Sequence, residues 1–293
     1  MDLTDKSRLI KYLKQNDLWA KKSLGQNFLV DREVLNKIVE AAELKKTDTV
    51  IEIGPGSGVL TAELVQKVKQ VVAVEIDDKI AQLLHCSIVS LLKNNETMKQ
   101  LDNLKIVNAD ILKTDLSEII GTEKYKLVAN IPYYITSKIL EKFLAAKNKP
   151  ELIVLLVQKE VAERICAKPG DTSVLSIAVQ YYGQPEIVDI VKASSFFPAP
   201  KVDSAILKVR LKANSEKLIA MEKDLFKVVK AGFRSRRKTL VNNLMSGTNL
   251  SRDQLFDILE KIGLGKNVRA QELSIEEWIK LCQMLDVKCQ KCM

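Results

Sequence analysis

The sequence contains few of the side chains that proteins use to bind transition metals. It has one histidine, His85, and five cysteines among 293 residues. Cys289 and Cys292 form a single C-x-x-C pair, but a zinc site needs four ligands and His85 lies far from this pair in the sequence. No secretory leader precedes the cysteines, so we expect reduced thiols in a cytoplasmic protein. The sequence therefore predicts no metal site.

Long hydrophobic runs are also absent. No apolar stretch approaches the ~20 residues that a membrane-spanning helix requires, so we expect no membrane partner. Hydrophobic residues nevertheless make up 46% of the chain, which is enough to bury a sizeable core. A chain of 293 residues is long enough for one large globular domain and a small one.

Acidic residues are fewer than basic ones. The chain has 46 Lys and Arg against 37 Asp and Glu, a net charge of +9. This balance favours a polyanionic partner, nucleic acid first, although a basic soluble surface without such a partner gives the same composition. Many of the basic residues are clustered, which favours nucleic acid: Lys21, Lys22, Lys159, Arg164, Lys168, Lys201 and residues 234–238.

Residues 50–61, Val-Ile-Glu-Ile-Gly-Pro-Gly-Ser-Gly-Val-Leu-Thr, predict an apolar strand, a tight glycine turn and the start of a helix. Glu52, Gly54, Gly56 and Gly58 give the pattern E-x-G-x-G-x-G. Glycine lets a ligand approach the backbone and adopts positive φ angles. A dinucleotide fingerprint, G-x-G-x-x-G, would need glycine at position 59, where this chain has valine. The spacing favours S-adenosylmethionine over NAD, with an ordinary strand-to-helix turn as the alternative.

Acidic residues follow the next two predicted strands. The strand at residues 71–74 ends in Glu75, about twenty residues beyond the glycine turn, where α/β nucleotide sites carry the acceptor for two ribose hydroxyls. The strand at residues 104–107 is followed by Asp110, whose carboxylate would accept a hydrogen bond from the adenine amino group of the cofactor. Capping of a helix explains Asp110 equally well.

A fourth predicted strand, residues 127–129, runs directly into Asn130-Ile131-Pro132-Tyr133. The exocyclic amine of adenine is a poor nucleophile because its lone pair is delocalised into the ring. Acceptors on both amino hydrogens, the Asn130 side-chain oxygen and a nearby main-chain carbonyl, would make the nitrogen more tetrahedral and direct its lone pair at a methyl group. Pro132 stiffens the turn, and Tyr133 offers a ring on which a flipped base stacks. Taken alone, the tetrapeptide is also typical of a strand-ending turn with a packed tyrosine.

Two loops contain further candidate binding residues. Residues 195–204, Ser-Phe-Phe-Pro-Ala-Pro-Lys-Val-Asp-Ser, are stiffened by prolines, and an aromatic ring beside Lys201 suits base stacking and phosphate contact. The polar loop at residues 21–29 precedes the glycine turn and would fold over a bound ligand, or serve as a simple surface connection.

From about residue 212 the pattern changes to short helices, predicted at residues 225–233, 238–245, 252–262 and 275–285. Ser251 with Gln254, and Ser274 with Glu277, form capping boxes that define two of the helix starts. This part of the chain is therefore predicted to be α-helical throughout.

The basic run at residues 234–238, Arg-Ser-Arg-Arg-Lys, argues against one continuous helix over residues 225–245. Such a helix would place Arg236 and Arg237 in or beside its apolar stripe, and burying unpaired guanidinium groups is too costly. We predict a break near residues 232–235 that exposes the arginines or pairs them with acids. Contact with an RNA backbone is one interpretation of this run, and a solvated charge run is the other.

Together these segments resemble the small-subunit ribosomal RNA adenine dimethyltransferase family. The resemblance covers nearly the whole chain and is carried by Lys-Ser-Leu-Gly-Gln-Asn-Phe-Leu at residues 22–29, Glu-Ile-Gly-Pro-Gly-Ser-Gly at 52–58, Asn-Ile-Pro-Tyr at 130–133 and Phe-x-Pro-x-Pro-Lys-Val-Asp-Ser at 196–204. It implies that the cofactor is bound by Asn27, Leu29, Gly54, Glu75, Asp110 and Asn130. It also implies that Asn130 orients the amine and that Phe196 is the second wall of the base pocket, opposite Tyr133.

The resemblance further implies the fold and the reaction. The fold is α/β: a Rossmann-like class I methyltransferase domain at residues 1–211, including an N-terminal helical arm at 1–30, with seven strands of which the seventh is antiparallel. Residues 212–293 form a smaller C-terminal α-helical domain that helps to bind RNA. The reaction is S-adenosylmethionine-dependent dimethylation of two adjacent adenosines near the 3′ end of small-subunit (16S) rRNA. The partner is the immature small ribosomal subunit, and the enzyme is a monomer.

Two other functions stay open at this point. Large-subunit adenine methyltransferases share Asn-Ile-Pro-Tyr but lack the segments that resemble the small-subunit enzyme at residues 236–244 and 269–274. A non-catalytic assembly or transcription factor would retain the fold for RNA binding alone. One departure from the family is a longer spacing between Glu75 and Asp110, which suggests an insertion around residues 93–100.

Overall fold

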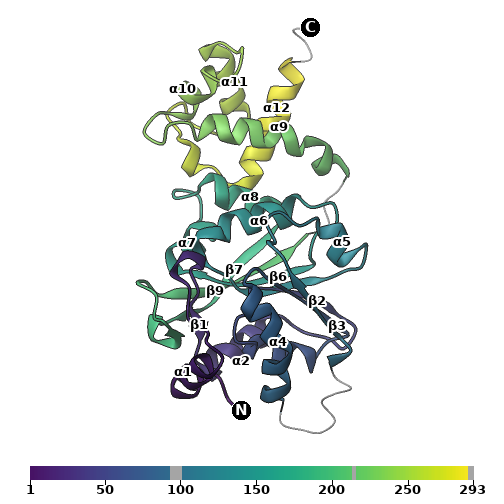
Figure 1. Ribbon diagram of the computed structural model, residues 1–293. Helices are drawn as coiled ribbons and strands as arrows, with labels where there is room; N and C mark the ends of the chain where they lie inside the picture. Colours follow the sequence, from purple (N-terminus) through teal and green to yellow (C-terminus); the bar gives the residue numbers. More distant parts are fainter. Residues whose placement is uncertain (93–100, 213–215, 290–293) are drawn as a thin grey trace. The chain divides into compact units, whose positions relative to one another are not determined.

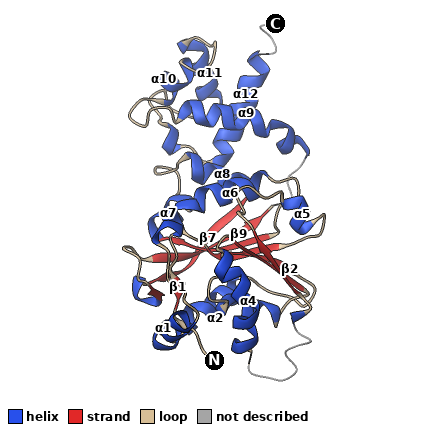
Figure 2. Cartoon of the chain, in the orientation of Figure 1, coloured by secondary structure: helices blue, strands red, loops and turns tan. Residues whose placement is uncertain are grey.

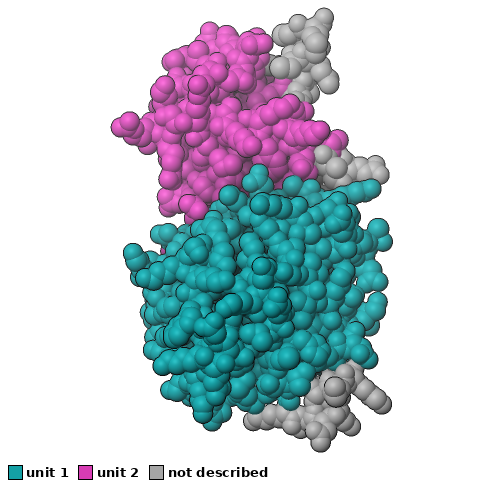
Figure 3. Space-filling view, in the orientation of Figure 1, with its two compact units in different colours: residues 1–162, 185–211 teal, residues 163–184, 212–293 magenta. Residues whose placement is uncertain are grey.

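The computed structural model describes residues 1–92, 101–212 and 216–289. The chain forms two compact units (Figure 3). Unit 1 comprises Met1–Ala162 and Pro185–Leu211, and unit 2 comprises Glu163–Gln184 and Lys212–Met293. The expected insertion at residues 93–100 and the Cys292 end of the C-x-x-C pair lie outside the described residues. Within the described part of the chain, no helix is long and apolar enough to cross a membrane.

The centre of unit 1 is a seven-stranded sheet in the order β4-β3-β2-β5-β6-β9-β7 (Figures 1 and 2). The strands β2 to β6 pair in parallel, and β9, the seventh of these strands along the chain, pairs antiparallel with β6. This confirms the predicted Rossmann-like α/β class. The strands are β2 Thr49–Ile53, β3 Gln70–Glu75, β4 Leu104–Asn108, β5 Lys126–Asn130, β6 Leu152–Gln158, β7 Gly183–Val191 and β9 Ser204–Leu211.

Helices cover both faces of this sheet, with α2 and α4 on one face and α5 and α6 on the other (Figure 1). All of β2 and all but the last residue of β6 are buried, as expected of parallel strands covered on both sides. The helices are α1 Lys6–Gln15, α2 Arg32–Ala41, α3 Val59–Val65, α4 Asp78–Leu91, α5 Leu116–Ile120 and α6 Thr136–Ala145. The helix α7, Lys159–Ile165, follows β6.

The strand order reverses at β2 and β5, which are neighbours in the sheet. Strands β3 and β4 continue on one side of this pair and β6 on the other. In an open α/β sheet a crevice forms at the carboxyl ends of the strands at such a reversal. Residues that follow β2 and β5 therefore meet at one edge of the sheet.

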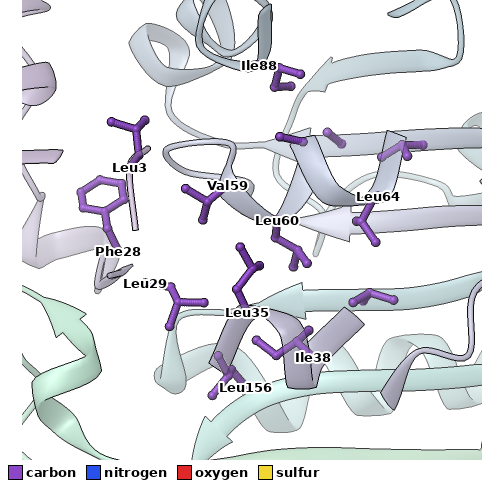
Figure 4. Packing of buried hydrophobic residues seen from close by; sticks show 14 of the residues in the cluster. Leu3, Phe28, Leu29, Leu35, Ile38, Val59, Leu60, Leu64, Ile88 and Leu156 are labelled. Atoms are coloured by element: carbon purple, nitrogen blue, oxygen red, sulfur yellow. The ribbon is translucent and has the colours of Figure 1, made fainter. Parts of the chain in front are cut away.

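The core beneath this edge joins segments that are distant in the sequence (Figure 4). Leu29 precedes α2, Leu35 and Ile38 lie on α2, and Leu60 lies on α3. Each of these side chains is at most 4% exposed. The start of α2 is fixed by Asp31, which accepts hydrogen bonds from the main-chain amides of two first-turn residues, as a helix cap does. The ring of Phe28 lies against Gly56, so the loop at residues 21–29 is close to the glycine turn.

In the part of the chain that the structure describes, unit 2 contains the helices α8 Val174–Tyr182, α9 Glu216–Gly232, α10 Leu240–Met245, α11 Arg252–Lys261 and α12 Ile275–Cys289. Both predicted capping boxes are confirmed. Ser251 and Gln254 exchange main-chain to side-chain hydrogen bonds, and so do Ser274 and Glu277.

The predicted helix break is also confirmed, because α9 ends at Gly232 and α10 begins at Leu240. The Asn243 Nδ2 atom donates to the main-chain oxygens of Gly232, at 2.6 Å, and of Ser235, at 2.9 Å. A methyl group on Gly232 would overlap the buried ring of Trp278, so the chain packs too closely here for a side chain. The basic residues of the break are exposed: Arg234, Arg236, Arg237 and Lys238.

Candidate active site

A cavity of about 220 Å³ lies at the carboxyl ends of β2, β3 and β5. Its walls come from the loop at residues 21–29, the glycine turn, the residues after β3 and β4, and the turn after β5. Seven predicted site residues line it: Asn27, Leu29, Gly54, Glu75, Asp110, Asn130 and Tyr133. The fold thus brings to one cavity residues that are spread over more than a third of the sequence.

The glycine turn forms the floor of the cavity with bare backbone. Gly54, Gly56 and Gly58 have φ angles of 66°, 57° and 82°, a region that favours glycine. A Cβ atom on Gly56 would come within 3.2 Å of the Phe28 ring. The turn therefore needs glycine both for its conformation and for its approach to the loop at residues 21–29.

Glu75 ends β3 and is 3% exposed. Its Oε2 atom accepts from the Gly56 amide at 3.3 Å and its Oε1 atom from the Asp77 amide at 2.9 Å. Burial raises the pKa of Glu75, although these two amides oppose the rise. Each carboxylate oxygen has a second lone pair, so Glu75 retains capacity to accept from ligand hydroxyls.

Glu52 adds a second buried acid to the cavity wall. It is 1% exposed, lies one residue before the carboxyl end of β2, and its Oε2 atom has no hydrogen-bond partner among the described residues. Burial, helped by the charge of Glu75, raises the pKa of Glu52 to about 8. The sequence pattern E-x-G-x-G-x-G contains this residue, but its lack of a partner is visible only in three dimensions.

Asp110 follows β4 and is half-buried in the cavity wall. Its Oδ1 atom accepts from the Leu112 amide at 3.0 Å and thereby shapes the turn after the strand. Asp110 therefore caps no described helix, because α5 begins at Leu116 and its cap is Asp115. Its other carboxylate oxygen, Oδ2, is 3.9 Å from Lys113 Nζ.

The loop at residues 21–29 is fastened beside the cavity by Asp77. Lys21 Nζ lies 2.7 Å from Asp77 Oδ2, and Gln26 Nε2 donates to the same oxygen at 3.4 Å. Burial acts against ionisation of Asp77, yet the Lys21 ammonium holds its pKa below the usual range. Because the main-chain amide of Asp77 also donates to the Glu75 carboxylate, Asp77 connects the loop with Glu75.

Asn130, the last residue of β5, is oriented by the same loop. Its Nδ2 atom donates to the main-chain oxygen of Asn27 at 3.1 Å. This leaves the Asn130 Oδ1 atom as an acceptor, and no described group donates to it. The side-chain Nδ2 atom of Asn27 in turn donates to the main-chain oxygen of Gly25 at 3.1 Å. The arrangement can present one amide oxygen to a ligand amino group.

Tyr133 lies in a 3₁₀ turn, Tyr133–Ile135, directly after Asn130-Ile131-Pro132. Its hydroxyl group and Ser204 Oγ are 2.6 Å apart, which connects this turn with the start of β9. Burial raises the pKa of Tyr133, so the phenol stays neutral at physiological pH. The ring is half-buried, and its position in the cavity wall is fixed by the bond to Ser204.

Phe196 lies elsewhere. It belongs to β8, Phe196–Phe197, which pairs with β1, Phe28–Leu29, so that Phe196 is opposite Leu29. The Phe196 side chain is 1% exposed and packs in the same buried cluster as Leu29, rather than lining the cavity. Phe197 is half-buried, with Lys6 Nζ 5.7 Å from its ring centroid. The role of Phe196 as a base-pocket wall stays a prediction.

Among the lining residues that the sequence did not single out, two carry an exposed aromatic ring or charge. Tyr134 is 63% exposed, and Lys138, on the first turns of α6, is exposed as well. The available signal was an aromatic residue directly after Asn-Ile-Pro-Tyr, followed by a lysine four residues later.

The lining residues fit S-adenosylmethionine. Glu52 and Glu75 are acids buried beside one another, and a cationic ligand would relieve their electrostatic cost. The Oε2 atom of Glu52 has no hydrogen-bond partner among the described residues, although the Thr61 side chain opposes the rise in the pKa of this carboxyl, so a ligand donor can pair with Oε2. The positive φ angles of Gly54 and Gly56 leave bare backbone against which a ligand can lie.

Comparison with known proteins supplies the family. A family model described as ribosomal RNA adenine dimethylase matches residues 18–286. A ribosomal RNA small subunit methyltransferase A from Dehalococcoides mccartyi is 48% identical over 266 residues, which cover 90% of this chain and 88% of the relative. A protein of the same name from Lachnoclostridium phytofermentans is 38% identical over 294 residues, 98% of both chains.

Two solved structures are also similar. A 23S rRNA methyltransferase, ErmE, has a TM-score of 0.70 and 30% identity, and the alignment covers 89% of this chain and 100% of that one. A dimethyladenosine transferase from Plasmodium falciparum has a TM-score of 0.74 and 27% identity, with coverage of 89% and 98%. Both similarities extend over nearly all of the neighbouring chain.

Proposed function

The chain belongs to the ribosomal RNA adenine dimethylase family, and we propose from this that it dimethylates the 6-amino nitrogens of two adjacent adenosines near the 3′ end of small-subunit rRNA, with S-adenosylmethionine as the methyl donor. The substrate is the rRNA of the immature small ribosomal subunit. The observation that carries the proposal is the Asn130 amide, oriented by the Asn27 carbonyl in the wall of a cavity with two buried acids.

The cofactor would be held at the glycine edge of the cavity, which comprises the glycine turn at residues 52–58 with Glu75 and Asp110. Glu75 accepts from ribose hydroxyls, Asp110 from the adenine amino group, and Glu52 pairs with the cationic end of the cofactor, while Asn27, Leu29 and Gly54 contact it from the loop and the turn. When bound, the cofactor supplies an activated methyl group: each transfer breaks an S–C bond, forms an N–C bond and releases one amino proton to water.

The chain acts on the nucleophile through Asn130. Its Oδ1 atom accepts a hydrogen bond from the target amine, and a neighbouring main-chain carbonyl accepts the second. These bonds draw the nitrogen lone pair out of conjugation and direct it at the methyl carbon. Tyr133 stacks on the flipped base, with its ring fixed by the bond from its hydroxyl to Ser204. Phe196 is the candidate for the opposite wall, which requires its ring to leave the buried cluster when RNA binds.

We assign the small rather than the large ribosomal subunit as substrate for two reasons: the sequence identity to relatives of each kind, and the C-terminal segments of the chain. Identity is 48% to a small-subunit methyltransferase and 30% to the 23S enzyme ErmE. The segments at residues 236–244 and 269–274 resemble the small-subunit enzymes. Residues 1–211 would form the catalytic domain and residues 212–293 the helical domain that helps to bind RNA, in a cytoplasmic monomer. The basic residues exposed between α9 and α10 support RNA contact by the second domain.

The test is methyl transfer from labelled cofactor to purified ribosomal subunits that lack the modification, followed by mapping of the labelled nucleotides. We expect two adjacent dimethylated adenosines near the 3′ end of the small-subunit rRNA and no label in large subunits. Label confined to large subunits would establish the alternative, a 23S-type enzyme. Binding of small subunits without label would instead indicate an assembly factor.

A further inference from the structure

Tyr134 is an exposed aromatic ring beside the cavity that no step described above uses. Its side chain is 63% exposed, although it lines the same cavity as Asn130 and Tyr133. No described residue forms a hydrogen bond with its hydroxyl group. One side of the ring lies close to Gly25, where an added Cβ atom would be 3.2 Å from the ring carbons. The ring is thus supported by the loop on one side and open to solvent on the other.

The geometry of the turn separates Tyr134 from Tyr133. Both residues lie in the 3₁₀ turn Tyr133–Ile135, in which successive side chains diverge by about 120° because there are three residues per turn. Tyr133 is tethered to Ser204 and half-buried, whereas Tyr134 faces outward. The two rings therefore cannot enclose the same base, yet their Cα atoms are only about 3.8 Å apart.

Lys138 provides a cation at the same edge. It is exposed, lines the cavity, and forms no ion pair with any acid in the described part of the chain. An aromatic ring with a free face next to an unpaired ammonium group matches the two parts of a nucleotide, because a base stacks on the ring and a phosphate contacts the cation. Tyr134 is too exposed to be a core residue.

We propose that Tyr134 stacks on the base of the nucleotide next to the target adenosine and that Lys138 contacts the adjoining phosphate. This rests on the proposed function and deepens it. While one adenosine is flipped onto Tyr133, the neighbouring adenosine stacks on Tyr134 at the cavity edge. The two adenosines exchange positions between the first and second dimethylation. Tyr134 is thus a positioning residue for the RNA, and it contributes nothing to cofactor affinity.

The experiment compares four proteins on under-methylated small subunits: wild type, Tyr134→Ala, Tyr134→Phe and Lys138→Gln. We expect Tyr134→Ala to lower kcat/KM for the subunit at least fivefold, as loss of one base-aromatic stack does. It should also leave more molecules with only one of the two adenosines dimethylated, measured by mass spectrometry of the rRNA fragment. Tyr134→Phe keeps the ring and should remain within twofold of wild type. Lys138→Gln should lower kcat/KM about twofold to threefold, and only at low salt.

Two controls distinguish this proposal from its alternatives. Trp19→Ala removes a ring that is 61% exposed from a residue outside the cavity lining, and it should leave the product ratio unchanged. The dissociation constant of S-adenosylmethionine, measured by calorimetry, should not change in Tyr134→Ala. An unchanged kcat/KM and product ratio in Tyr134→Ala, or a loss explained by weaker cofactor binding, would overturn the proposal. If wild type labelled no small-subunit adenosine, the proposed function itself would fail.

Discussion

Glu75 and Tyr134 line the same cavity, but the first is 3% exposed and the second 63%. Two main-chain amides hold the Glu75 carboxylate, whereas the Tyr134 hydroxyl has no partner in the described residues. The glycine edge of the cavity is therefore built into the sheet before any ligand arrives. The other edge, formed by residues 130–138, keeps the Asn130 Oδ1 acceptor, the Tyr134 ring and the Lys138 ammonium group accessible. We call it the Asn130–Lys138 edge. A small ligand of fixed shape suits the first arrangement, and part of a large RNA suits the second.

Asn130→Ala is expected to have the largest effect and to separate the two edges. Removing the amide oxygen that orients the amine should lower kcat for methyl transfer by about a hundredfold or more. Affinity for S-adenosylmethionine should change less than about threefold, because most contacts of the glycine edge persist. The measurement is transfer of labelled methyl groups with calorimetry of cofactor binding. Asn36→Ala, at an exposed position of α2, is the matched control. Full activity of Asn130→Ala would contradict the assigned role.

Glu75→Gln should produce the opposite pattern. Loss of a charged acceptor costs about 1.5 to 3 kcal/mol for hydrogen bonds to ligand hydroxyls, so the KM for S-adenosylmethionine should rise about tenfold or more. At saturating cofactor, kcat should stay within about threefold of wild type, since the amine is oriented by the other edge. Asp78→Asn removes a neighbouring exposed acid and should leave both parameters unchanged. A fall in kcat without a change in KM would contradict the assignment of cofactor binding to the glycine edge and of amine orientation to the Asn130–Lys138 edge.

Glu52→Gln should raise the thermal stability of the cofactor-free protein in a pH-dependent way. Burial keeps Glu52 protonated in the folded state up to about pH 8, while in the unfolded chain it ionises near its usual pKa of 4.5. Between these values the unfolded state binds fewer protons, so stability falls as pH rises. Glutamine removes this loss. The gain in Tm should be smallest near pH 5 and reach several degrees at pH 8. A gain independent of pH would argue against a buried, protonated Glu52.

Lys21→Gln should have the smallest effect. It breaks the ion pair with Asp77 that fastens the loop at residues 21–29, but the Lys21 side chain is 49% exposed and the pair is screened by solvent. We expect the KM for S-adenosylmethionine to rise about twofold at low salt and the difference to vanish at high salt. Lys22→Gln, which removes the adjacent exposed ammonium, is the control. An effect that persisted at high salt would indicate a direct contact with the cofactor.

Much of the fold and of the glycine edge could be predicted because the signals are local. The buried strands β2, β3 and β6 consist mainly of apolar residues, and parallel strands bring their carboxyl ends to one edge of the sheet. Residues that follow such strands, including Glu75 and Asn130, therefore lie together without any knowledge of tertiary contacts. The break between α9 and α10 followed from the cost of burying guanidinium groups.

The remaining features depend on contacts between distant segments. The strand β7 was not assigned individually, since Pro185 interrupts its alternating pattern and its pairing is set by the neighbouring β9. The burial of Phe196 results from pairing of the two-residue strands β1 and β8, which leaves no periodic signal. Whether Glu52 finds a donor, and whether Tyr134 is covered, likewise depends on the packing of other elements around them.

Because Gly232 packs tightly against Trp278, substitution of Gly232 is expected to give a temperature-sensitive variant. An alanine at position 232 has to displace the indole ring, which loosens the helices of unit 2 at the turn where Asn243 joins α9 and α10. None of the residues that line the cavity belongs to unit 2. Warming such a variant would melt the helical unit first and leave cofactor binding in place. If unit 2 helps to bind RNA, as proposed above, a shift of a few degrees would abolish methyl transfer to the ribosomal substrate while the methyl donor stayed bound.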